Sequence, residues 1–398
     1  MSSSTLQNTT EETELNQHFS DLEIFLQKKP LYYKEIDITR MPRVYAKIKS
    51  SFCYGKVIHI IGTNGKGTTG RFIASALKRQ GVLVGHYTSP HILNFNERIW
   101  IDGSNITDEQ LGVAHKKLLS ILDFEDAQSL SYFEYTTLLA LSSFEGCDYI
   151  VLEAGLGGEH DATNVVDKCL SVVTPIGFDH ELFLGNDIKS IATTKLNAMS
   201  KNVILGYQKY DEVYHIAQRI ATQNSSKIAY LKDLNNDSIV DMVAKEIKLT
   251  GYLKDNLSLA VAALKILDVS ASMHDFKDAA LFGRMSLIAP NIYLDVGHNE
   301  LAASAVTKYF KGEKITLIYN TYDDKNFEQI LQILKPVVRE VEILRIKNTR
   351  VAPLKVLQST LESLNMPYKM FTSLSRNKKY LVFGSFSVAE EFLKFLSA

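Results

Sequence analysis

The chain has 398 residues, and its 45% hydrophobic and 22% charged residues suit a soluble globular protein with two or three buried cores. Its 44 lysines and arginines balance 45 aspartates and glutamates, so the formal net charge of −1 argues against a dedicated nucleic-acid-binding protein, which would usually be basic. Three cysteines without metal-like spacing (Cys53, Cys147 and Cys169) argue against a disulfide framework and favour a reducing, cytoplasmic setting.

The start of the chain carries no sign of a targeting segment. The first 17 residues are polar and partly acidic, without the basic start and apolar run of a signal peptide. We interpret residues 1–16 as a flexible tail. No stretch approaches the roughly 20 apolar residues of a membrane-spanning helix. We therefore expect a cytoplasmic protein, monomeric, with neither nucleic acid nor a membrane as its partner.

Apolar runs alternate with helical patterns along the first part of the chain. Residues 56–61 indicate a buried strand, 62–67 a Gly-rich loop, and 68–80 a helix. Further strands are predicted at 82–87, 148–153 and 169–174. Strands separated by helices indicate a mostly parallel sheet that is covered on both faces.

A second set of strands begins late in the chain. Short strands are predicted at residues 292–295, 315–319, 340–346 and 380–383, with helices at 328–334 and 388–396. Residues 282–291 lie between the two sets, so we place the domain boundary there. The sequence thus predicts an α/β protein with a P-loop-type, mostly parallel sheet domain over 17–285 and a smaller Rossmann-like α/β domain over 286–398.

The motif Gly62-Thr63-Asn64-Gly65-Lys66-Gly67-Thr68 joins the first predicted strand to its helix. In such a loop the backbone N–H groups converge on an anion, and the following helix presents its positive end to the same point. Lys66 would supply a mobile charge for the outer phosphates, and the Thr68 hydroxyl could reach a magnesium ion. The spacing departs from the common pattern G-x-x-x-x-G-K-[ST], so an ordinary tight turn is the alternative. We predict a nucleotide-phosphate site.

This form, GTNGKGT, resembles the folylpolyglutamate synthase/dihydrofolate synthase family, which is related to the Mur peptidoglycan ligases. The resemblance continues in order through five further motifs over roughly residues 55–390. They are Thr88-Ser89-Pro90-His91 with Phe95-Asn96-Glu97-Arg98-Ile99, Leu152-Glu153-Ala154-Gly155-Leu156-Gly157-Gly158 with Asp161-Ala162-Thr163-Asn164, Gly177-Phe178-Asp179-His180, Phe282-Gly283-Arg284, and Asp295-Val296-Gly297-His298-Asn299.

Several positions depart from the family's pattern. Glu159 stands where the family usually has Arg, which removes a positive charge near the site. Lys195 is kept, but its neighbours differ from the usual IA-x-EKAG. Phe282 replaces a proline, Val296-Gly297 replaces Gly-Ala, and the usual His-Gln before Asn256 is absent. The chain thus resembles a divergent member.

The resemblance implies an ATP-dependent ligase. ATP would phosphorylate a carboxylate to an acyl phosphate, and the amine of L-glutamate would then form an amide and release phosphate. A carboxylate is a poor electrophile, and phosphoryl transfer gathers negative charges that need cations and aimed N–H groups. The implied cofactors are ATP and two Mg²⁺ ions, with K⁺ as a further candidate. The first domain would bind ATP, and the second would be a glutamate-ligase domain that closes over it and excludes water.

The resemblance also implies site residues. Ser89, Glu153 and His180 would ligate one magnesium ion, with Thr68 near the other; a carboxylate at a strand end can hold a hard cation. Lys195 would be carbamylated by carbon dioxide and so become an anion that orients magnesium. The alternatives are a solvated or helix-capping acid for Glu153, a packed histidine for His180 and a surface lysine for Lys195. Lys66, His180 and Lys195 are the implied catalytic residues.

The implied ATP-binding residues come from both domains. Asn256 would lie on the adenine side, Arg284 would bind a phosphate, and Asp295 would bind a ribose or orient a neighbour. Lys325 resembles the lysine of the family's DKD motif and would lie near the incoming glutamate, the alternative being a solvated lysine. The full implied set is Gly62, Thr63, Asn64, Gly65, Lys66, Gly67, Thr68, Thr69, Asn256, Arg284, Asp295 and His298.

The acceptor stays open between alternatives. The first is dihydropteroate, reduced folates or both, with L-glutamate as the amine; the FNERI motif favours it. The second is another carboxylate, such as a cell-wall precursor. The third is a nucleotide-dependent switch without amide formation, which the second-domain motif at 295–299 disfavours. Phe95, Tyr132, Phe133 and Tyr135 are candidates for a pterin pocket, although ordinary core packing is the favoured interpretation of each.

Overall fold

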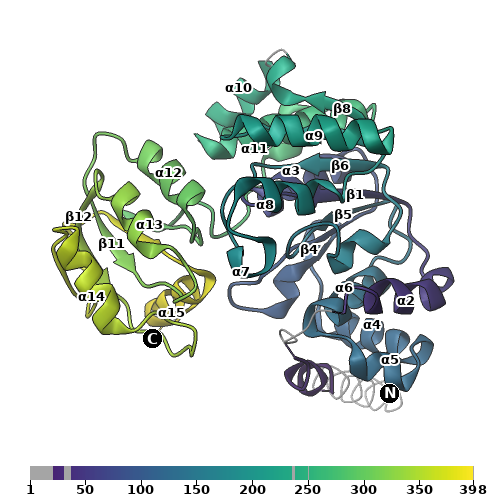
Figure 1. Cartoon of the computed structure of the whole chain (residues 1–398), viewed down its shortest axis with the longest axis horizontal. Coiled ribbons are helices and arrows are strands. Elements are labelled where there is room, and N and C mark those ends of the chain that lie inside the picture. The colour runs from purple at the N-terminus through teal and green to yellow at the C-terminus, as the bar shows by residue number, and fades with distance from the viewer. Residues whose placement is uncertain (1–20, 31–36, 235–237, 250, 398) are drawn as a thin grey trace, which may run out of the picture.

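The computed structural model describes residues 21–30, 37–234, 238–249 and 251–397, so the predicted tail at 1–16 lies outside the described residues. Two sheet-containing domains lie next to each other, the first drawn in purple to green and the second in green to yellow (Figure 1). The predicted α/β class with two sheet domains is confirmed.

The first domain contains an eight-stranded sheet of order β4-β3-β2-β5-β1-β6-β7-β8. Six neighbouring strands of this order, β2-β5-β1-β6-β7-β8, pair in parallel. Strands β3 and β4 add an antiparallel edge next to β2. The strands are β1 (Lys56–Ile61), β2 (Val84–Tyr87), β3 (Ile99–Ile101), β4 (Ser104–Asn105), β5 (Tyr149–Glu153), β6 (Leu170–Val173), β7 (Asn202–Leu205) and β8 (Lys227–Tyr230).

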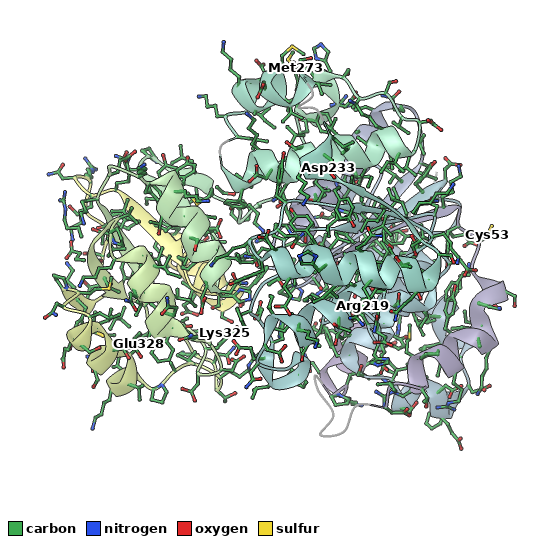
Figure 2. All side chains as sticks on the ribbon, turned by 45° about the horizontal axis from the view of Figure 1, so that its top comes forward. Cys53, Arg219, Asp233, Met273, Lys325 and Glu328 are labelled. Atoms are coloured by element: carbon green, nitrogen blue, oxygen red, sulfur yellow. The ribbon has the colours of Figure 1, made fainter. Side chains whose placement is uncertain are left out.

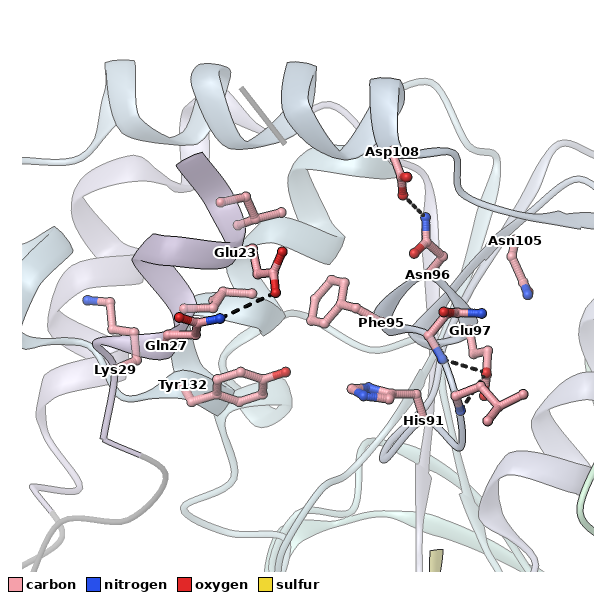
Figure 3. Close-up of a pocket in the computed structure, with 14 residues that line it drawn as sticks. Glu23, Gln27, Lys29, His91, Phe95, Asn96, Glu97, Asn105, Asp108 and Tyr132 are labelled. Carbon is pink, nitrogen blue, oxygen red and sulfur yellow. Dashed lines mark hydrogen bonds between the residues drawn. The ribbon is translucent and has the colours of Figure 1, made fainter. Parts of the chain in front are cut away.

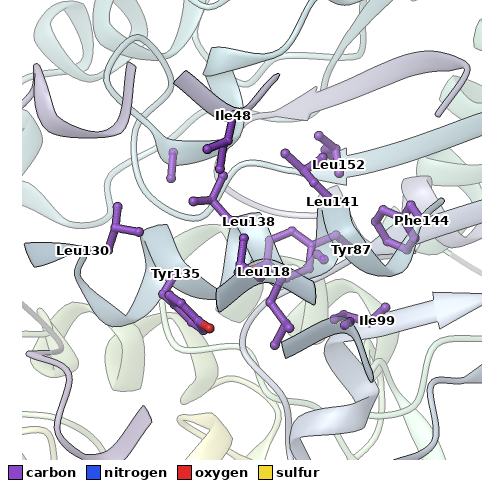
Figure 4. Close-up of a cluster of buried hydrophobic side chains, with 14 of the residues drawn as sticks. Ile48, Tyr87, Ile99, Leu118, Leu130, Tyr135, Leu138, Leu141, Phe144 and Leu152 are labelled. Carbon is purple, nitrogen blue, oxygen red and sulfur yellow. The ribbon is translucent and has the colours of Figure 1, made fainter. Parts of the chain in front are cut away.

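Helices cover both faces of this sheet. On one face α3, α10 and α11 pack against alternate residues of the central strands, such as Ile58 and Ile60. On the other face α4 and α6 pack against β2 and β5 (Figure 4), and α8 and α9 against β6 and β7. The helices are α2 (Arg40–Ile48), α3 (Lys66–Arg79), α4 (Asp108–Ile121), α5 (Phe124–Ser129), α6 (Tyr132–Ser143), α7 (Glu181–Leu184), α8 (Ile188–Leu196), α9 (Asp211–Asn224), α10 (Ser238–Glu246) and α11 (Tyr252–Ile266).

The second domain contains a six-stranded sheet of order β13-β12-β11-β14-β10-β9, in which only β9 runs antiparallel to its neighbour. Helices α12, α13 and α14 cover one face and α15 the other. The elements are β9 (Ser286–Ala289), β10 (Ile292–Leu294), α12 (Glu300–Tyr309), β11 (Ile315–Tyr319), α13 (Phe327–Leu334), β12 (Val338–Ile343), α14 (Leu354–Ser363), β13 (Tyr368–Met370), β14 (Tyr380–Phe383) and α15 (Phe386–Ser397).

All eight predicted strands exist; β1, β11 and β14 have the predicted ends, and the largest shift is in β12, which ends three residues before the predicted 346. The predicted loop at 62–67 was too long, because α3 begins at Lys66 rather than at residue 68. Six further strands, β3, β4, β7, β8, β9 and β13, were not predicted. Among the described residues no helix is both long and apolar enough to span a membrane.

Candidate active site between the two domains

The phosphate loop connects β1 to α3 and is shaped by its glycines. Gly65 is the N-cap of α3 and has a φ of +87°, a left-handed conformation that a side chain would disfavour. A Cβ atom there would also lie 2.4 Å from Oδ1 of Asn256, the predicted adenine-side residue. The first N–H groups of α3 have no partner within the helix, and with the helix dipole they suit an anion.

Lys66 folds back over this loop. Its Nζ atom donates to the carbonyl oxygens of Gly62 at 3.3 Å and Thr63 at 3.2 Å. The same atom lies 3.8 Å from Oε1 of Glu153. The lysine thus lies at the N-terminus of α3, where a bound phosphate would compete with the two carbonyl oxygens for its ammonium group.

Glu153 is the last residue of β5 and is only 6% exposed. Burial raises the pKa of its carboxyl group, and the nearby charges of Lys66 and Arg284 act in the opposite direction. Gly67 makes room for it, because a Cβ atom on Gly67 would lie 3.1 Å from Oε2. A bound cation would stabilise the charged form of this buried carboxylate.

The residues around Glu153 fit the implied magnesium. The backbone N–H of Ser89 lies 3.4 Å from Oε2 of Glu153, and Oγ1 of Thr68 is buried without a hydrogen-bond partner. Within the described part of the chain, no group of three or more His, Cys, Asp or Glu residues could hold a metal ion. Magnesium needs none, since it usually keeps several waters and takes one or two protein oxygens with substrate phosphates.

His180 lines the same cavity as Ser89 and Glu153. It has a φ of +55° and forms the N-cap of α7. Burial lowers the pKa of its imidazole to about 4, although the charge of Asp179 acts in the opposite direction. The imidazole is therefore neutral near pH 7, the form that can offer a ring nitrogen to a metal ion.

Lys195 lies on α8 and is 3% exposed, so the surface-lysine alternative is wrong. Its Nζ atom donates to the Gly62 carbonyl oxygen at 3.1 Å, the same oxygen that Lys66 contacts. Burial, and then the charge of Lys66, lowers the pKa of Lys195 to about 7. A neutral amine in this position is able to react with carbon dioxide.

Asp179 connects the first domain to the second. Its carboxylate accepts a hydrogen bond from Nζ of Lys325 at 2.7 Å and lies 3.4 Å from Nε2 of His298 and 3.2 Å from Nδ2 of Asn299. Burial alone would raise the pKa of Asp179, but the hydrogen bond from His298 and the surrounding positive charges hold it well below its usual value. Lys325 is labelled in Figure 2, and its side chain is 8% exposed rather than solvated.

Arg284 and Asp295 line the same cavity. The Arg284 guanidinium carbon lies 5.5 Å from the ring centroid of Phe386, a cation–π arrangement. Asp295 accepts hydrogen bonds from the Tyr252 hydroxyl at 2.6 Å, from the N–H of Met285 at 3.0 Å and from the N–H of Gly297 at 2.8 Å. The sequence left two roles open for Asp295, binding a ribose or orienting a neighbouring residue. These three hydrogen bonds favour the second role.

These residues line one cavity of about 780 Å³ to which both domains contribute. It brings together most of the predicted ATP-binding and metal-binding residues, whereas Gly62, Thr68, Thr69 and Lys195 are buried and do not line it. It also contains residues that the sequence analysis missed, because no local pattern singles them out. Examples are Tyr207, Lys209, Tyr252, Lys308 and Phe386.

A second cavity, of about 880 Å³, lies beyond residues 89–91. Figure 3 shows the side chains of His91, Phe95 and Tyr132 around it, with the helical residues 21–27 on one side. Ser89 and Pro90 line the first cavity and His91 the second, so the two adjoin.

Of the other two aromatic candidates, Tyr135 is a core residue and Phe133 is half-buried and packs against the core. Tyr135 is fully buried, and Phe133 packs beside Gly155, where a Cβ atom would lie 2.3 Å from its ring. Core packing, the favoured interpretation, therefore describes this pair, whereas Phe95 and Tyr132 line a cavity.

Comparison with known proteins gives consistent relatives, although no family model matches the chain. The dihydrofolate synthase/folylpolyglutamate synthase of Haemophilus influenzae is 30% identical over 91% of this chain and 94% of its own length. The crystal structure of Helicobacter pylori folylpolyglutamate synthetase is 40% identical, with a TM-score of 0.77 over 94% of this chain and 98% of its own. Escherichia coli FolC in complex with DHPP and ADP is 27% identical, with a TM-score of 0.79 over 95% and 97%. The chain therefore belongs to the dihydrofolate synthase/folylpolyglutamate synthase family.

Proposed function

We propose that the chain is an ATP-dependent ligase that adds L-glutamate to dihydropteroate, to reduced folates, or to both. The observation that carries the proposal is the cavity between the domains, where the phosphate loop, the buried Glu153 and Arg284 from the segment that links the domains face the same space. Escherichia coli FolC, solved with DHPP and ADP, supports a nucleotide and a second small molecule as ligands of this chain.

The first step would be transfer of the ATP γ-phosphoryl group to an oxygen of the acceptor carboxylate, which releases ADP. The N–H groups at the start of α3 would hold the phosphates, and Lys66 would exchange its carbonyl partners for phosphate oxygens. Arg284, on the segment that links the two domains, would act as a bidentate donor. Bound magnesium would neutralise phosphate charge; Ser89, Glu153 and His180 would hold one ion, Thr68 would lie near the other, and a carbamylated Lys195 would help to orient the metal.

In the second step the amine of L-glutamate would attack the acyl carbon, lose a proton and expel inorganic phosphate. Lys325 and His298 contact Asp179 from the second domain, and His298 also lines the cavity, so they are placed to orient the glutamate carboxylates. The contacts that Asp179 makes with the second domain would also keep the site closed, which protects the acyl phosphate from water.

The proposal includes finer points taken from the family resemblance. The proposal includes two magnesium ions. The carboxylate of Glu153 and the hydroxyl groups of Ser89 and Thr68 would be enough protein ligands, because magnesium usually takes its remaining ligands from water and substrate phosphates. The cysteines Cys53, Cys147 and Cys169 are all free, which suits a reducing cytoplasm. The potassium ion, the monomeric state and the absence of nucleic-acid and membrane partners stay predictions.

We place the acceptor's ring system in the second cavity. Phe95 and Tyr132 offer aromatic faces there, and the adjoining residues 89–91 would let a carboxylate tail reach the first cavity. The side chain of Arg98 supports this wall, since its guanidinium lies 5.4 Å from the Tyr132 ring centroid.

Tyr132→Leu is expected to raise KM for the acceptor about five- to tenfold, because loss of one aromatic stacking partner costs about 1 kcal/mol. KM for ATP should stay unchanged, as measured by initial rates with each substrate varied in turn. Phe124→Leu is the matched control, since Phe124 is 78% exposed and lines neither cavity. An unchanged acceptor KM in Tyr132→Leu would remove the ring system from this cavity.

Phosphate release from ATP tests the function itself. The purified enzyme is offered L-glutamate with dihydropteroate and, separately, with tetrahydrofolate. Release that requires both glutamate and an acceptor is expected with at least one of the two, and the pattern decides between one activity and both. Glutamate-dependent release with neither acceptor would contradict the folate assignment and leave a Mur-like ligase with another carboxylate as the alternative.

A further inference from the structure

The N-terminal end of α11 touches both domains. Most of the helix packs on α3 in the core of the first domain. Leu253, its second residue, instead belongs to the hydrophobic cluster of the second domain, and Tyr252 packs against the same cluster. The Tyr252 hydroxyl donates to Oδ2 of Asp295, which follows β10, at 2.6 Å. This hydrogen bond therefore ties the first domain to the second beside the nucleotide cavity.

The carboxylate of Asp295 is already occupied by protein donors. Besides the tyrosine hydroxyl it accepts the backbone N–H groups of Met285 at 3.0 Å and Gly297 at 2.8 Å, and the residue is 4% exposed. Both oxygens thus have partners that fix the backbone on either side of the carboxylate. Such an arrangement orients neighbouring segments rather than offering a free oxygen to a ligand.

The segment that Asp295 fixes is the turn carrying Arg284. Gly283 has a φ of +80° and Met285 a φ of +47°, so the residues on both sides of Arg284 are left-handed. Methionine rarely adopts this conformation, and a surrounding contact must hold it. The hydrogen bond from the Met285 N–H to Asp295 is such a contact. The turn directs Arg284 into the cavity, where its guanidinium lies against Phe386.

We propose that Tyr252 is a positioning residue for the nucleotide: by donating to Asp295 it holds the 283–285 turn, and with it Arg284, in the orientation that binds a phosphate. The inference rests on the proposed function, because it takes Arg284 as a phosphate ligand. Burial, followed by the charge of Asp295, keeps the pKa of Tyr252 well above its usual value, so the hydroxyl remains a donor.

Tyr252→Phe removes this hydroxyl and keeps the ring that packs between the domains. Both KM for ATP and the dissociation constant of AMPPNP, a non-hydrolysable ATP analogue measured by calorimetry, should rise about tenfold, as expected for loss of a hydrogen bond to a charged group. KM for L-glutamate should change less than about twofold. Tyr380→Phe is the matched control, because it removes a buried tyrosine hydroxyl in the second domain that accepts a hydrogen bond from the Ser375 N–H at 3.0 Å and lines neither cavity.

Repeating the Tyr252→Phe change in an Arg284→Ala enzyme separates an effect on the position of Arg284 from a general weakening of the contact between the domains. If Tyr252 acts through Arg284, then in an Arg284→Ala enzyme the additional Tyr252→Phe change should alter AMPPNP affinity less than about twofold. A tenfold effect in both backgrounds, or none in the otherwise unaltered enzyme, would overturn the inference. Failure of the unaltered enzyme to bind AMPPNP would instead contradict the proposed nucleotide site, so the two failures are distinguishable.

Discussion

Lys66→Ala is expected to lower kcat/KM for ATP-dependent ligation about a thousandfold while the protein stays folded. The ammonium group lies at the N-terminus of α3, 3.8 Å from Glu153, and one charge about 4 Å from a phosphate is worth about 4 kcal/mol at an effective dielectric constant of 20. That energy corresponds to roughly three orders of magnitude in rate. Glutamate-dependent phosphate release measures the effect.

Lys78→Ala is the control for Lys66→Ala, since it removes the same side chain from the last turn of the same helix. Both variants should keep a melting temperature within a few degrees of that of the unaltered enzyme, because neither empties a hydrophobic core. Near-normal turnover in Lys66→Ala would remove the loop lysine from the mechanism. Equal losses in both variants would point to a general effect on α3.

Lys195→Ala is expected to cost at least about a hundredfold in kcat, the loss usual for a group that orients a catalytic metal or charge. A carbamate forms from a neutral amine and carbon dioxide with release of a proton. With its pKa lowered to about 7 by burial and then by Lys66, the Lys195 amine is largely neutral at pH 8, whereas an ordinary lysine is almost entirely protonated. As the pH falls through 7 the amine becomes protonated, so the carbamate and the activity should decline together.

Carbon-13 NMR of the active enzyme under labelled carbon dioxide checks the modification directly. One carbamate resonance is expected in the unaltered enzyme and in Lys189→Ala, which changes an exposed lysine on the same helix. The resonance should disappear in Lys195→Ala. Full activity at pH 8 in an enzyme whose mass and NMR spectrum show Lys195 unmodified would refute the carbamate.

Most strands that the sequence predicted are buried on both faces. Residues of β1, β6 and β14 are apolar almost without interruption, and that pattern is visible without knowledge of the fold. Three of the missed strands carry weaker patterns, whereas the missed β7 is buried at three of its four residues. β8 is an edge strand whose residues are exposed or half-buried, β4 has only two polar residues, and β9 pairs antiparallel at the edge of its sheet. Their pairing depends on the neighbouring strand more than on their own composition.

The residues of the site likewise fall into those that a local sequence pattern reveals and those that it does not. Gly62, Gly65 and Glu153 could be predicted because each belongs to a local motif whose residues follow a strand. The contacts of Asp179 with Lys325 and of Tyr252 with Asp295 join segments 146 and 43 residues apart, so no local pattern reveals them. The burial of Lys195 was equally hidden, since its neighbours Thr193 and Thr194 resemble those of an exposed helix face.

Oxygen transfer from the acceptor to phosphate tests the central claim most directly. The enzyme is given ATP, L-glutamate and an acceptor, dihydropteroate or tetrahydrofolate, whose reacting carboxylate is labelled with oxygen-18, and both products are analysed by mass spectrometry. Ligation through an acyl phosphate predicts an acceptor lengthened by one glutamate and one labelled oxygen in the released phosphate. An acceptor recovered without glutamate, or phosphate released without the label, would contradict the account.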